Sequence, residues 1–363
     1  MRRMGFVGSL GAALLASGAG SAVRANDSSA ELSIGGLVFT QNADVSMESE
    51  DLTITPENVT VKYRFLNQSA APVTLTVAFP LPDIDLAEFD ANFSIPANDP
   101  VNFVGFQTKI DGKPVKFDVV QRAFLGTKDI SAAVRAAGLP LLPVGAQRSG
   151  ISGLNEQARE KLVADGLLVP AGTNQNGQTI YNGSWTVKTS VVRKQTFPPG
   201  KPVGVEHRYR TSVGLSLDTV LRKAVRETQA MEAELQRYRA QYCVPDELLK
   251  GIDKIAGTAE ANTAKLQERR ISYVLKTGAN WAGPIKDFRL VVDKGRADRL
   301  VSFCGENVKK ISPTAFEMRA KDFTPTQDLK ILLISKAEVA DARKLPTVDK
   351  PVPSSVLVDR PSP

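Results

Sequence analysis

The 363-residue sequence has a single histidine, two cysteines and few aromatic residues, which make up 6% of the chain. One histidine excludes metal sites built from several imidazoles. The GxSxG, GxGxxG, P-loop and HExxH patterns are also missing, and with them the usual signatures of serine hydrolases, nucleotide-binding proteins and zinc proteases. These absences leave no common catalytic machinery, and we expect no cofactor.

Long apolar runs are also missing after the first 25 residues, so we expect no transmembrane segment in the mature chain. The start of the chain has a basic Met1–Arg3, an apolar stretch from Gly5 to Ala16, and small residues at Val23 and Ala25. This pattern predicts a cleaved signal peptide over residues 1–25 and a periplasmic or secreted protein. The alternative is an uncleaved amphipathic anchor.

The charge is only mildly basic. The chain has 46 Lys and Arg against 39 Asp and Glu. Because Arg2, Arg3 and Arg24 leave with the leader, the mature balance is 43 against 39, or +4. The basic residues form no stripe interleaved with aromatics, so we expect no nucleic-acid partner.

Alternating apolar and polar residues dominate the mature sequence, most clearly in VTVKYRFLNQSAAPVTLTVAFPLPD from Val59 to Asp83. Each arm of this stretch has the period of a half-buried strand, and Asn67–Pro72 reads as the turn of a hairpin. A hairpin needs a second sheet to cover its apolar face. Asp111-Gly112 marks a second tight turn between strands. The stretch therefore predicts a β-sandwich.

The fold class that we predict is mainly β with helical insertions (α+β), as two β-sandwich-like domains joined by a helical hairpin. The first sandwich covers residues 26–217 and has a helical insertion at about 128–183. The linker covers residues 218–268, and a smaller sandwich covers 269–340. The proline-rich segment 341–363 reads as a disordered tail.

Two helices are predicted in the linker. Asp218–Tyr242 has apolar residues at alternating steps of three and four, with Asp218 as a plausible N-cap. This stripe packs onto its own protein or forms a coiled-coil seam between two copies, so the oligomeric state stays open. Pro245 begins the second helix, whose buried face includes Leu248, Leu249 and Ile252.

The two cysteines, Cys243 and Cys304, are far apart in the sequence. In an exported chain such a pair is most simply a structural disulfide. A redox-active pair needs closer spacing, and a metal site needs neighbouring histidines. The predicted bond would tie the helical linker to the following sheet.

The candidate site residues each have a structural and a functional interpretation. His207 is the sole possible imidazole base, or a packed strand residue. Trp185 and Trp281 could stack on a sugar, or belong to the core. The carboxylates from residue 83 to residue 90 could bind calcium, or form a solvated acidic turn. That acidic group consists of Asp83, Asp85, Glu88 and Asp90.

Several motifs together resemble an uncharacterised bacterial family, domain of unknown function 4424. They are GGLVFTQNADVSMESEDL, YRFLNQS followed by VAFPLPD, FPPGKPVGVEHRYRTSVG, TGANWAGPIKDFRLVVDKG, and the Tyr242-Cys243 and Phe303-Cys304 pairs. The resemblance implies an exported bacterial protein and supplies no catalytic residue. FPLP, FQTKIDGKPVKFDVVQRA and PPG with VGVEHRYR are also faintly similar to VIT modules, which are β-sandwiches associated with protein interaction.

Three functions remain open. The first is a non-enzymatic protein that binds an envelope or periplasmic protein partner, which fits the predicted sandwiches and the empty motif search. The second is a binder of a small molecule, a carbohydrate or calcium. The third is an enzyme that uses His207.

Overall fold

The computed structural model describes residues 28–33, 36–40, 42–87, 93–97, 99–143, 151, 153–174, 176–257, 266–337 and 355–356. The predicted signal peptide over 1–25 lies outside the described residues. The predicted disordered tail also lies outside them, apart from residues 355–356.

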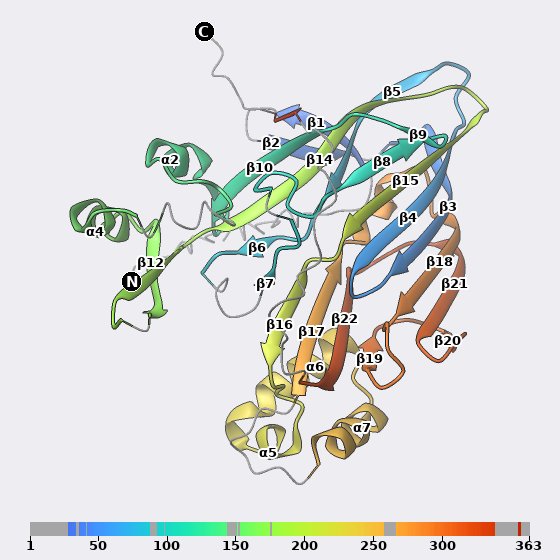
Figure 1. The fold of residues 1–363 in the computed structure, drawn as a ribbon. Coiled ribbons are helices and arrows are strands. Elements are labelled where there is room, and N and C mark those ends of the chain that lie inside the picture. Colours follow the sequence, from blue (N-terminus) through green and yellow to red (C-terminus); the bar gives the residue numbers. More distant parts are fainter. Residues whose placement is uncertain are drawn as a thin grey trace, which may run out of the picture.

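Two large sheets dominate the fold (Figure 1). Sheet A has the order β11 (Lys128–Asp129), β10 (Asp118–Leu125), β14 (Thr186–Phe197), β5 (Val73–Pro80), β1 (Ser28–Ser33) and β2 (Gly36–Thr40). In addition, β6 (Ile84–Asp85) pairs with β14, and β23 (Ser355–Val356) pairs with β10. Sheet B has the order β20 (Lys309–Lys310), β21 (Ala315–Phe323), β18 (Ile285–Asp293), β3 (Val45–Ile54), β4 (Asn58–Asn67), β15 (Pro202–Arg210), β8 (Gln107–Ile110) and β9 (Lys113–Pro114).

A third, five-stranded sheet carries the helices of the linker. Sheet C has the order β19 (Leu300–Phe303), β22 (Leu329–Lys336), β17 (Leu266–Tyr273), β16 (Val213–Leu217) and β7 (Phe93–Ser94). The α-helices α5 (Lys223–Arg226), α6 (Glu232–Tyr242) and α7 (Asp246–Ala256) gather at its end in Figure 1. Apolar residues of α7, including Leu249 and Ile252, pack against Leu332 and Ile334 of β22.

The insertion forms a small unit beside sheet A. It contains α2 (Ser131–Ala136), α4 (Glu156–Ala164) and a two-stranded ribbon of β12 (Leu168–Thr173) and β13 (Thr179–Gly183). Gly138 and Gly166 follow the two helices with φ of 71° each, the left-handed conformation expected of a glycine that ends a helix. The prediction of a mainly β fold with helical insertions is therefore confirmed.

The stretch from Val59 to Asp83 forms both of the predicted strands, β4 and β5, but these two strands do not pair with each other. β4 pairs with β3 and β15 in sheet B, whereas β5 pairs with β14 and β1 in sheet A. The prediction of a hairpin was wrong, because alternation shows which side chains are buried and does not show which strand is the neighbour. Instead the connection is an arch, and the Asn67 side chain fixes it by donating to the Ala71 and Phe197 carbonyl oxygens at 2.8 and 2.9 Å.

The inner faces of sheets A and B meet in one hydrophobic core. Val61 and Phe65 of β4 belong to the same buried cluster as Val77 and Phe79 of β5. A chain that crosses from one sheet to the other at an arch places the apolar faces of its two strands against each other. Sheets A and B therefore pack face to face, as the alternation of apolar and polar residues in the sequence predicts.

Strands from both sides of the predicted linker share sheets. In sheet B, β18 pairs in parallel with β3, with Leu290 opposite Leu52. In sheet C, β17 pairs with β16, with Arg270 opposite Gly214. These hydrogen-bonded pairings associate the two β regions more closely than a helical linker alone would.

The segment Asp218–Tyr242 is not the single helix that its periodicity suggested. It contains α5, a short 3-10 turn at Gln229–Met231 and α6. Asp218 has a φ of 96° and is no N-cap, and its two carboxylate oxygens share the Arg222 Nε–H, each at 3.0 Å from Nε. Arg226 forms an ion pair with Asp253 of α7 at 2.6 Å, which holds α5 against a different helix from α6. Tertiary contacts of this kind override a helical period.

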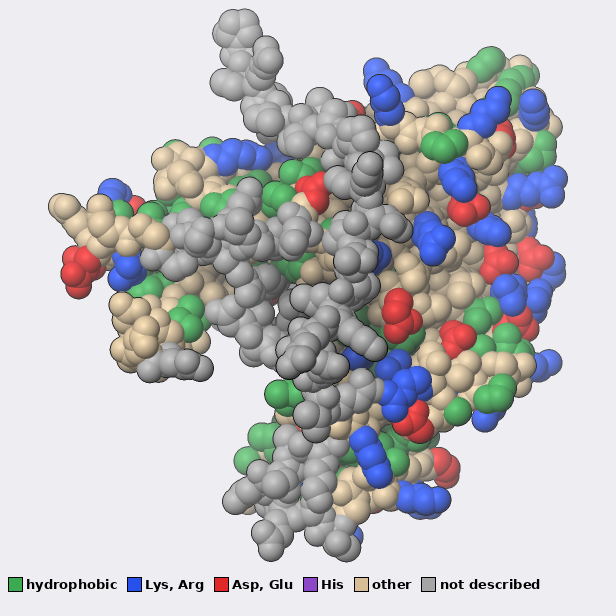
Figure 2. All heavy atoms as spheres, in the orientation of Figure 1, with side chains coloured by type: hydrophobic (Ala, Val, Ile, Leu, Met, Phe, Trp, Pro, Cys, Tyr) green, Lys and Arg blue, Asp and Glu red, His purple; other side chains and the backbone are tan. Residues whose placement is uncertain are grey.

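Basic and acidic side chains are mixed over the surface in Figure 2. Lysines and arginines on this face alternate with aspartates and glutamates, and apolar side chains lie among them. This mixture matches the mildly basic composition of the chain.

Candidate functional site

His207, the sole histidine, lies in β15 at the centre of the core. Its side chain has no solvent exposure. The imidazole packs against the rings of Tyr63, Phe79 and Phe106, with centroid distances of 5.7, 5.1 and 4.9 Å. Surrounded in this way, the ring acts as part of the packing between sheets A and B.

The two tryptophans are also buried. Trp185 has no exposure, and its Nε1 donates a hydrogen bond of 2.8 Å to the Leu141 carbonyl oxygen. Trp281 is 3% exposed and lies 4.5 Å from the Phe65 ring. Neither ring presents a face to solvent on which a sugar could stack.

The acidic group is divided by the structure. Asp83 and Asp85 line a surface cleft, whereas Glu88 and Asp90 lie outside the described residues. Asp83 is paired with Lys188, whose Nζ lies 3.5 Å from Oδ2. Within the part of the chain that the structure describes, no three His, Cys, Asp or Glu side chains are grouped as metal ligands.

The cleft has a volume of about 580 Å³ and lies between α6, the Pro80–Asp85 segment and the strands β16, β17 and β22. Its lining is rich in charged and hydroxyl side chains, and a volume of this size is typical of small-ligand sites. The lining residues that matter below are Asp83, Arg237, Tyr238, Arg270, Asp328 and Lys330.

The wall under α6 is built around a buried carboxylate. Glu268 of β17 is 1% exposed and accepts hydrogen bonds from Tyr238 at 2.7 Å and from Thr219 at 2.6 Å. Arg270 forms an ion pair with the same carboxylate, and its Nη1 also donates to the Ser216 hydroxyl at 3.0 Å. A buried charge needs such partners, so this network fixes Tyr238 and Arg270 at the cleft.

The phenols of the two α6 tyrosines are held in their neutral form. Burial, with the Glu268 charge second, raises the pKa of Tyr238. Burial also raises the pKa of Tyr242 to about 12. The rings lie 5.3 Å apart, and the Arg237 guanidinium lies 5.3 Å from the Tyr238 ring. Arg237 in turn pairs with Glu234 and donates to Gln241 at 2.9 Å.

The opposite end of the cleft is acidic. Asp328 Oδ1 accepts hydrogen bonds from the backbone N–H groups of Leu275 and Lys276 at 3.1 and 3.2 Å. Burial raises the pKa of Asp83, and the nearby Asp328 charge adds to this rise, while Lys188 and Lys330 act against it. The Asp83 carboxylate is therefore less well compensated than an ion-paired surface acid, although its side chain keeps 44% exposure.

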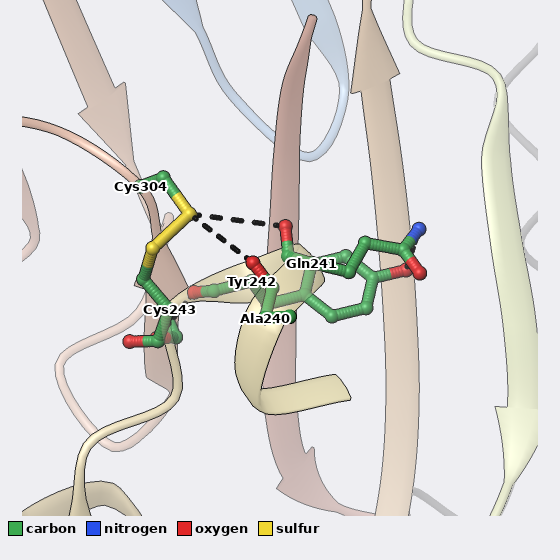
Figure 3. Close-up of a disulfide and its surroundings, with 6 residues drawn as sticks. Ala240, Gln241, Tyr242, Cys243 and Cys304 are labelled. Carbon is green, nitrogen blue, oxygen red and sulfur yellow. Dashed lines mark hydrogen bonds between the residues drawn. A yellow bond between two sulfur atoms is a disulfide. The ribbon is translucent and has the colours of Figure 1, made fainter. Parts of the chain in front are cut away.

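A disulfide fixes the C-terminal end of α6 (Figure 3). Cys243 and Cys304 are bonded, with their Cα atoms 5.0 Å apart, so the predicted bond is present. Cys243 ends α6 in the left-handed conformation with a φ of 50°. The Ser302 hydroxyl of β19 donates to the Tyr242 carbonyl oxygen at 2.9 Å. The bond and this contact together hold the cleft wall against sheet C.

Most of this cleft was not predicted from the sequence. Asp83 and Asp85 were among the candidate residues, whereas Arg237, Arg270 and Asp328 were not. One signal in the sequence could have indicated polar groups here. Tyr238 and Tyr242 lie on the apolar stripe of the predicted helix, and buried tyrosine hydroxyls usually need polar partners. Those partners come from β17, which sequence alone does not place under α6.

The described residues include no helix that is both long and apolar enough to cross a membrane. No curated protein matches this chain. Among solved structures, the chain is similar to the crystal structure of a candidate nutrient binding protein from Legionella pneumophila, at 15% identity and a TM-score of 0.39. The match covers 81% of this chain and 68% of that one. The family model of the domain of unknown function DUF4424 matches residues 25–332, and the chain belongs to that family.

Proposed function

We propose that this protein is an exported binding protein whose cleft beneath α6 holds a small polar ligand. The observation that carries the proposal is the cleft of about 580 Å³ with arginine, lysine, aspartate and tyrosine in its walls. Binding sites combine such a concave surface with a few fixed polar groups. Here Glu268 holds Tyr238 in place, and the disulfide holds the C-terminal end of α6.

Export is supported by two features. The first 25 residues have the pattern of a signal peptide. The Cys243–Cys304 disulfide uses both cysteines of the chain, and such bonds persist in oxidising compartments such as the periplasm.

An enzymatic function centred on His207 finds little support in the geometry. A general base has to come within hydrogen-bond reach of its substrate. The His207 side chain has no exposure and is enclosed by aromatic rings. The cleft is therefore the better candidate for contact with a ligand.

Blocking the cleft tests the proposal. Ser272 is a half-buried serine of β17 that lines the cleft, and Ser272→Trp would fill it. Ser49→Trp is the matched control, since Ser49 is a half-buried serine of β3 in sheet B and does not line the cleft. A library of small metabolites is screened by thermal shift against the wild-type protein and both variants.

We expect at least one class of compound to raise the melting temperature of the wild type and of Ser49→Trp, and to leave Ser272→Trp unchanged. A ligand bound only by the folded state stabilises it in proportion to the logarithm of its concentration over Kd. Compounds that stabilise all three proteins equally, or none of them, contradict the proposal.

A second candidate function, binding of an envelope protein, is favoured by the insertion. In Figure 1, α2, α4 and β12 lie to one side of the large sheets. Leu125, Val163 and Ile180, at or within the insertion, are 46%, 36% and 39% exposed. Connecting segments that project from a rigid scaffold often carry binding residues. Crosslinking in cells of the wild type and of a Leu125→Ser, Ile180→Ser variant tests it, and equal capture by the two proteins would contradict it.

A further inference from the structure

The charges in the cleft have an order along sheet C. Arg270 of β17 lies opposite Leu332 of β22, Ser272 lies opposite Lys330, and Tyr273 lies opposite Leu329. Asp328 immediately precedes Leu329. Arg270 therefore marks one end of the cleft, Lys330 lies between, and Asp328 marks the other end with Asp83 beside it.

At the Arg270 end of the cleft, some hydrogen-bond donors of the guanidinium are not bonded to the described part of the protein. The hydrogen bonds that hold Arg270, to Glu268, Tyr238 and Ser216, all use Nη1. Nη2 and Nε remain for a ligand, and a guanidinium fork of this kind suits a carboxylate. The pairing with Glu268 positions the fork before any ligand arrives, which lowers the entropic cost of binding.

At the other end of the cleft, the carboxylates of Asp328 and Asp83 have oxygen atoms that can accept further hydrogen bonds. Both backbone N–H groups that Asp328 holds are bonded to Oδ1, which leaves Oδ2 for a ligand. The Asp83 carboxylate has one lysine partner at 3.5 Å, a distance longer than a strong charge-assisted hydrogen bond. A protonated amine placed between these two carboxylates would compensate both.

The spacing of the two ends sets the length of the ligand. The Cα atoms of Leu332, which lies opposite Arg270, and of Asp328 are four residues apart on one chain, which is about 13 Å at about 3.3 Å per residue of strand. Four extended residues span this distance, and three residues, which span at most about 11 Å, reach it when an ion-pair distance of about 2.8 Å at each end is added. Between the ends, Lys330 Nζ donates a hydrogen bond of 3.0 Å to the Ser272 hydroxyl. The other protons of this ammonium group can bond to peptide carbonyl groups.

From this arrangement we propose that the cleft binds a peptide of three or four residues with free termini, its amino group at Asp83 and Asp328 and its carboxylate at Arg270. This inference rests on the proposed function, because it assigns a ligand class to the same cleft. It explains why both signs of charge line one cleft without being paired only to each other.

Isothermal titration of the mature protein with trialanine and its capped forms tests the inference. We expect trialanine and tetraalanine to bind more tightly than dialanine. N-acetyl-trialanine and trialanine amide should each bind about ten- to a hundredfold more weakly, since each lacks one charge-assisted contact. Equal affinity of the free and capped peptides would overturn the inference.

A pair of variants tests whether the amino group of the peptide lies at Asp83. Asp83→Asn should weaken trialanine binding about tenfold and should leave N-acetyl-trialanine unaffected, because that peptide has no amine to lose. Asp287→Asn is the control: Asp287 also pairs with a lysine, Lys321, at 3.0 Å, has a similar exposure of 50%, and does not line the cleft. Equal effects of the two variants would contradict the assignment.

The peptide inference and the proposed function fail in different ways. If no peptide binds but another compound stabilises the wild type and not Ser272→Trp, the ligand class is wrong and the cleft remains the site. If trialanine binds equally well to Ser272→Trp and to the wild type, the peptide binds outside the cleft and the peptide inference fails. The proposed function fails as well only if no other compound distinguishes Ser272→Trp from the wild type.

Discussion

Two polar clusters of this protein differ in what their polar groups face. In the core between sheets A and B, Glu50, Tyr63, Tyr273 and His207 are almost fully buried, and the Tyr63 and Tyr273 hydroxyl groups lie 3.1 Å apart. In the cleft, Glu268 is equally buried, yet it holds Arg270, whose side chain is 23% exposed. A buried polar residue therefore has a structural role when its partners are also buried, and it can serve binding when one of its partners reaches the surface.

The largest expected effect is on the core. Phe106 has no exposure and contacts the rings of Phe79 and His207. Phe106→Ala should lower the free energy of unfolding by about 3 to 5 kcal/mol, because it leaves a cavity among rings. Urea denaturation measures this loss, with the half-exposed Leu125→Ala as a control that should cost less than about 0.5 kcal/mol. A cost below about 1 kcal/mol for Phe106→Ala would show that the core is loosely packed.

Removal of the disulfide should come next. The bond closes a separation of 61 residues, and replacing both Cys243 and Cys304 by serine should cost about 2 to 4 kcal/mol. Because the bond ends α6 at the cleft, ligand affinity should fall as well. Reduction of the wild type gives the same comparison, since these are its two cysteines. Unchanged affinity after reduction would show that the cleft wall is fixed by other contacts.

Replacing the carboxylate beneath the cleft sharpens the comparison further. Glu268→Gln removes the charge that faces Arg270 and weakens the hydrogen bonds from Tyr238 and Thr219, so it should cost about 1 to 3 kcal/mol. Glu317→Gln is the control, because Glu317 of sheet B also pairs with arginines, Arg289 at 2.8 Å and Arg319 at 3.1 Å, while its side chain keeps 16% exposure. Its cost should stay below about 1 kcal/mol. Similar losses in urea denaturation for the two variants would mean that burial of Glu268 adds nothing.

The pattern of the sequence was sufficient where local chemistry decides the structure. The turn at Asp111-Gly112 joins β8 to β9, with φ of 47° and 79° at the two residues. Helix α7 begins after Pro245 and buries Leu248, Leu249 and Ile252 as expected. In each case the residues that determine the element lie within it or next to it.

The sequence was insufficient to predict features that depend on contacts between segments far apart in the chain. The partners of β4 and β5, and the parallel pairing of β18 with β3, depend on segments far apart in the chain, and alternation carries no information about them. Near the break between α5 and α6, Arg226 pairs with Asp253 of α7, a residue 27 positions further along the chain. The cleft needs all of these contacts at once, so Arg270 and Asp328 could not be identified as site residues beforehand.

The smallest expected effect is the pH dependence of Asp83. Burial raises the pKa of its carboxyl in the folded protein, so the folded state binds the proton more tightly than the unfolded state does. Stability should therefore fall as pH rises from the unfolded pKa to the folded pKa. Asp83→Asn should relieve this penalty at pH 7, by at most about 0.5 kcal/mol because the side chain is 44% exposed and water screens it.

Denaturation at pH 3 and pH 7 measures that difference. At pH 3, below the ordinary value of 3.8, the carboxyl is mostly protonated in both states, and the gain from Asp83→Asn should be nearly lost. Asp287→Asn, outside the cleft, controls for the loss of a carboxylate. A gain for Asp83→Asn that is the same at both pH values would have another origin.

We propose that the ligand contacts the cleft and not the buried imidazole. Nuclear magnetic resonance of the labelled protein tests it directly during a trialanine titration, since His207 is the only histidine and gives a single set of imidazole signals. We predict that amide signals of residues 237–242 and 270–274 move with added peptide, while the His207 signals stay in place. Movement of the His207 signals without movement of those amides would contradict the claim.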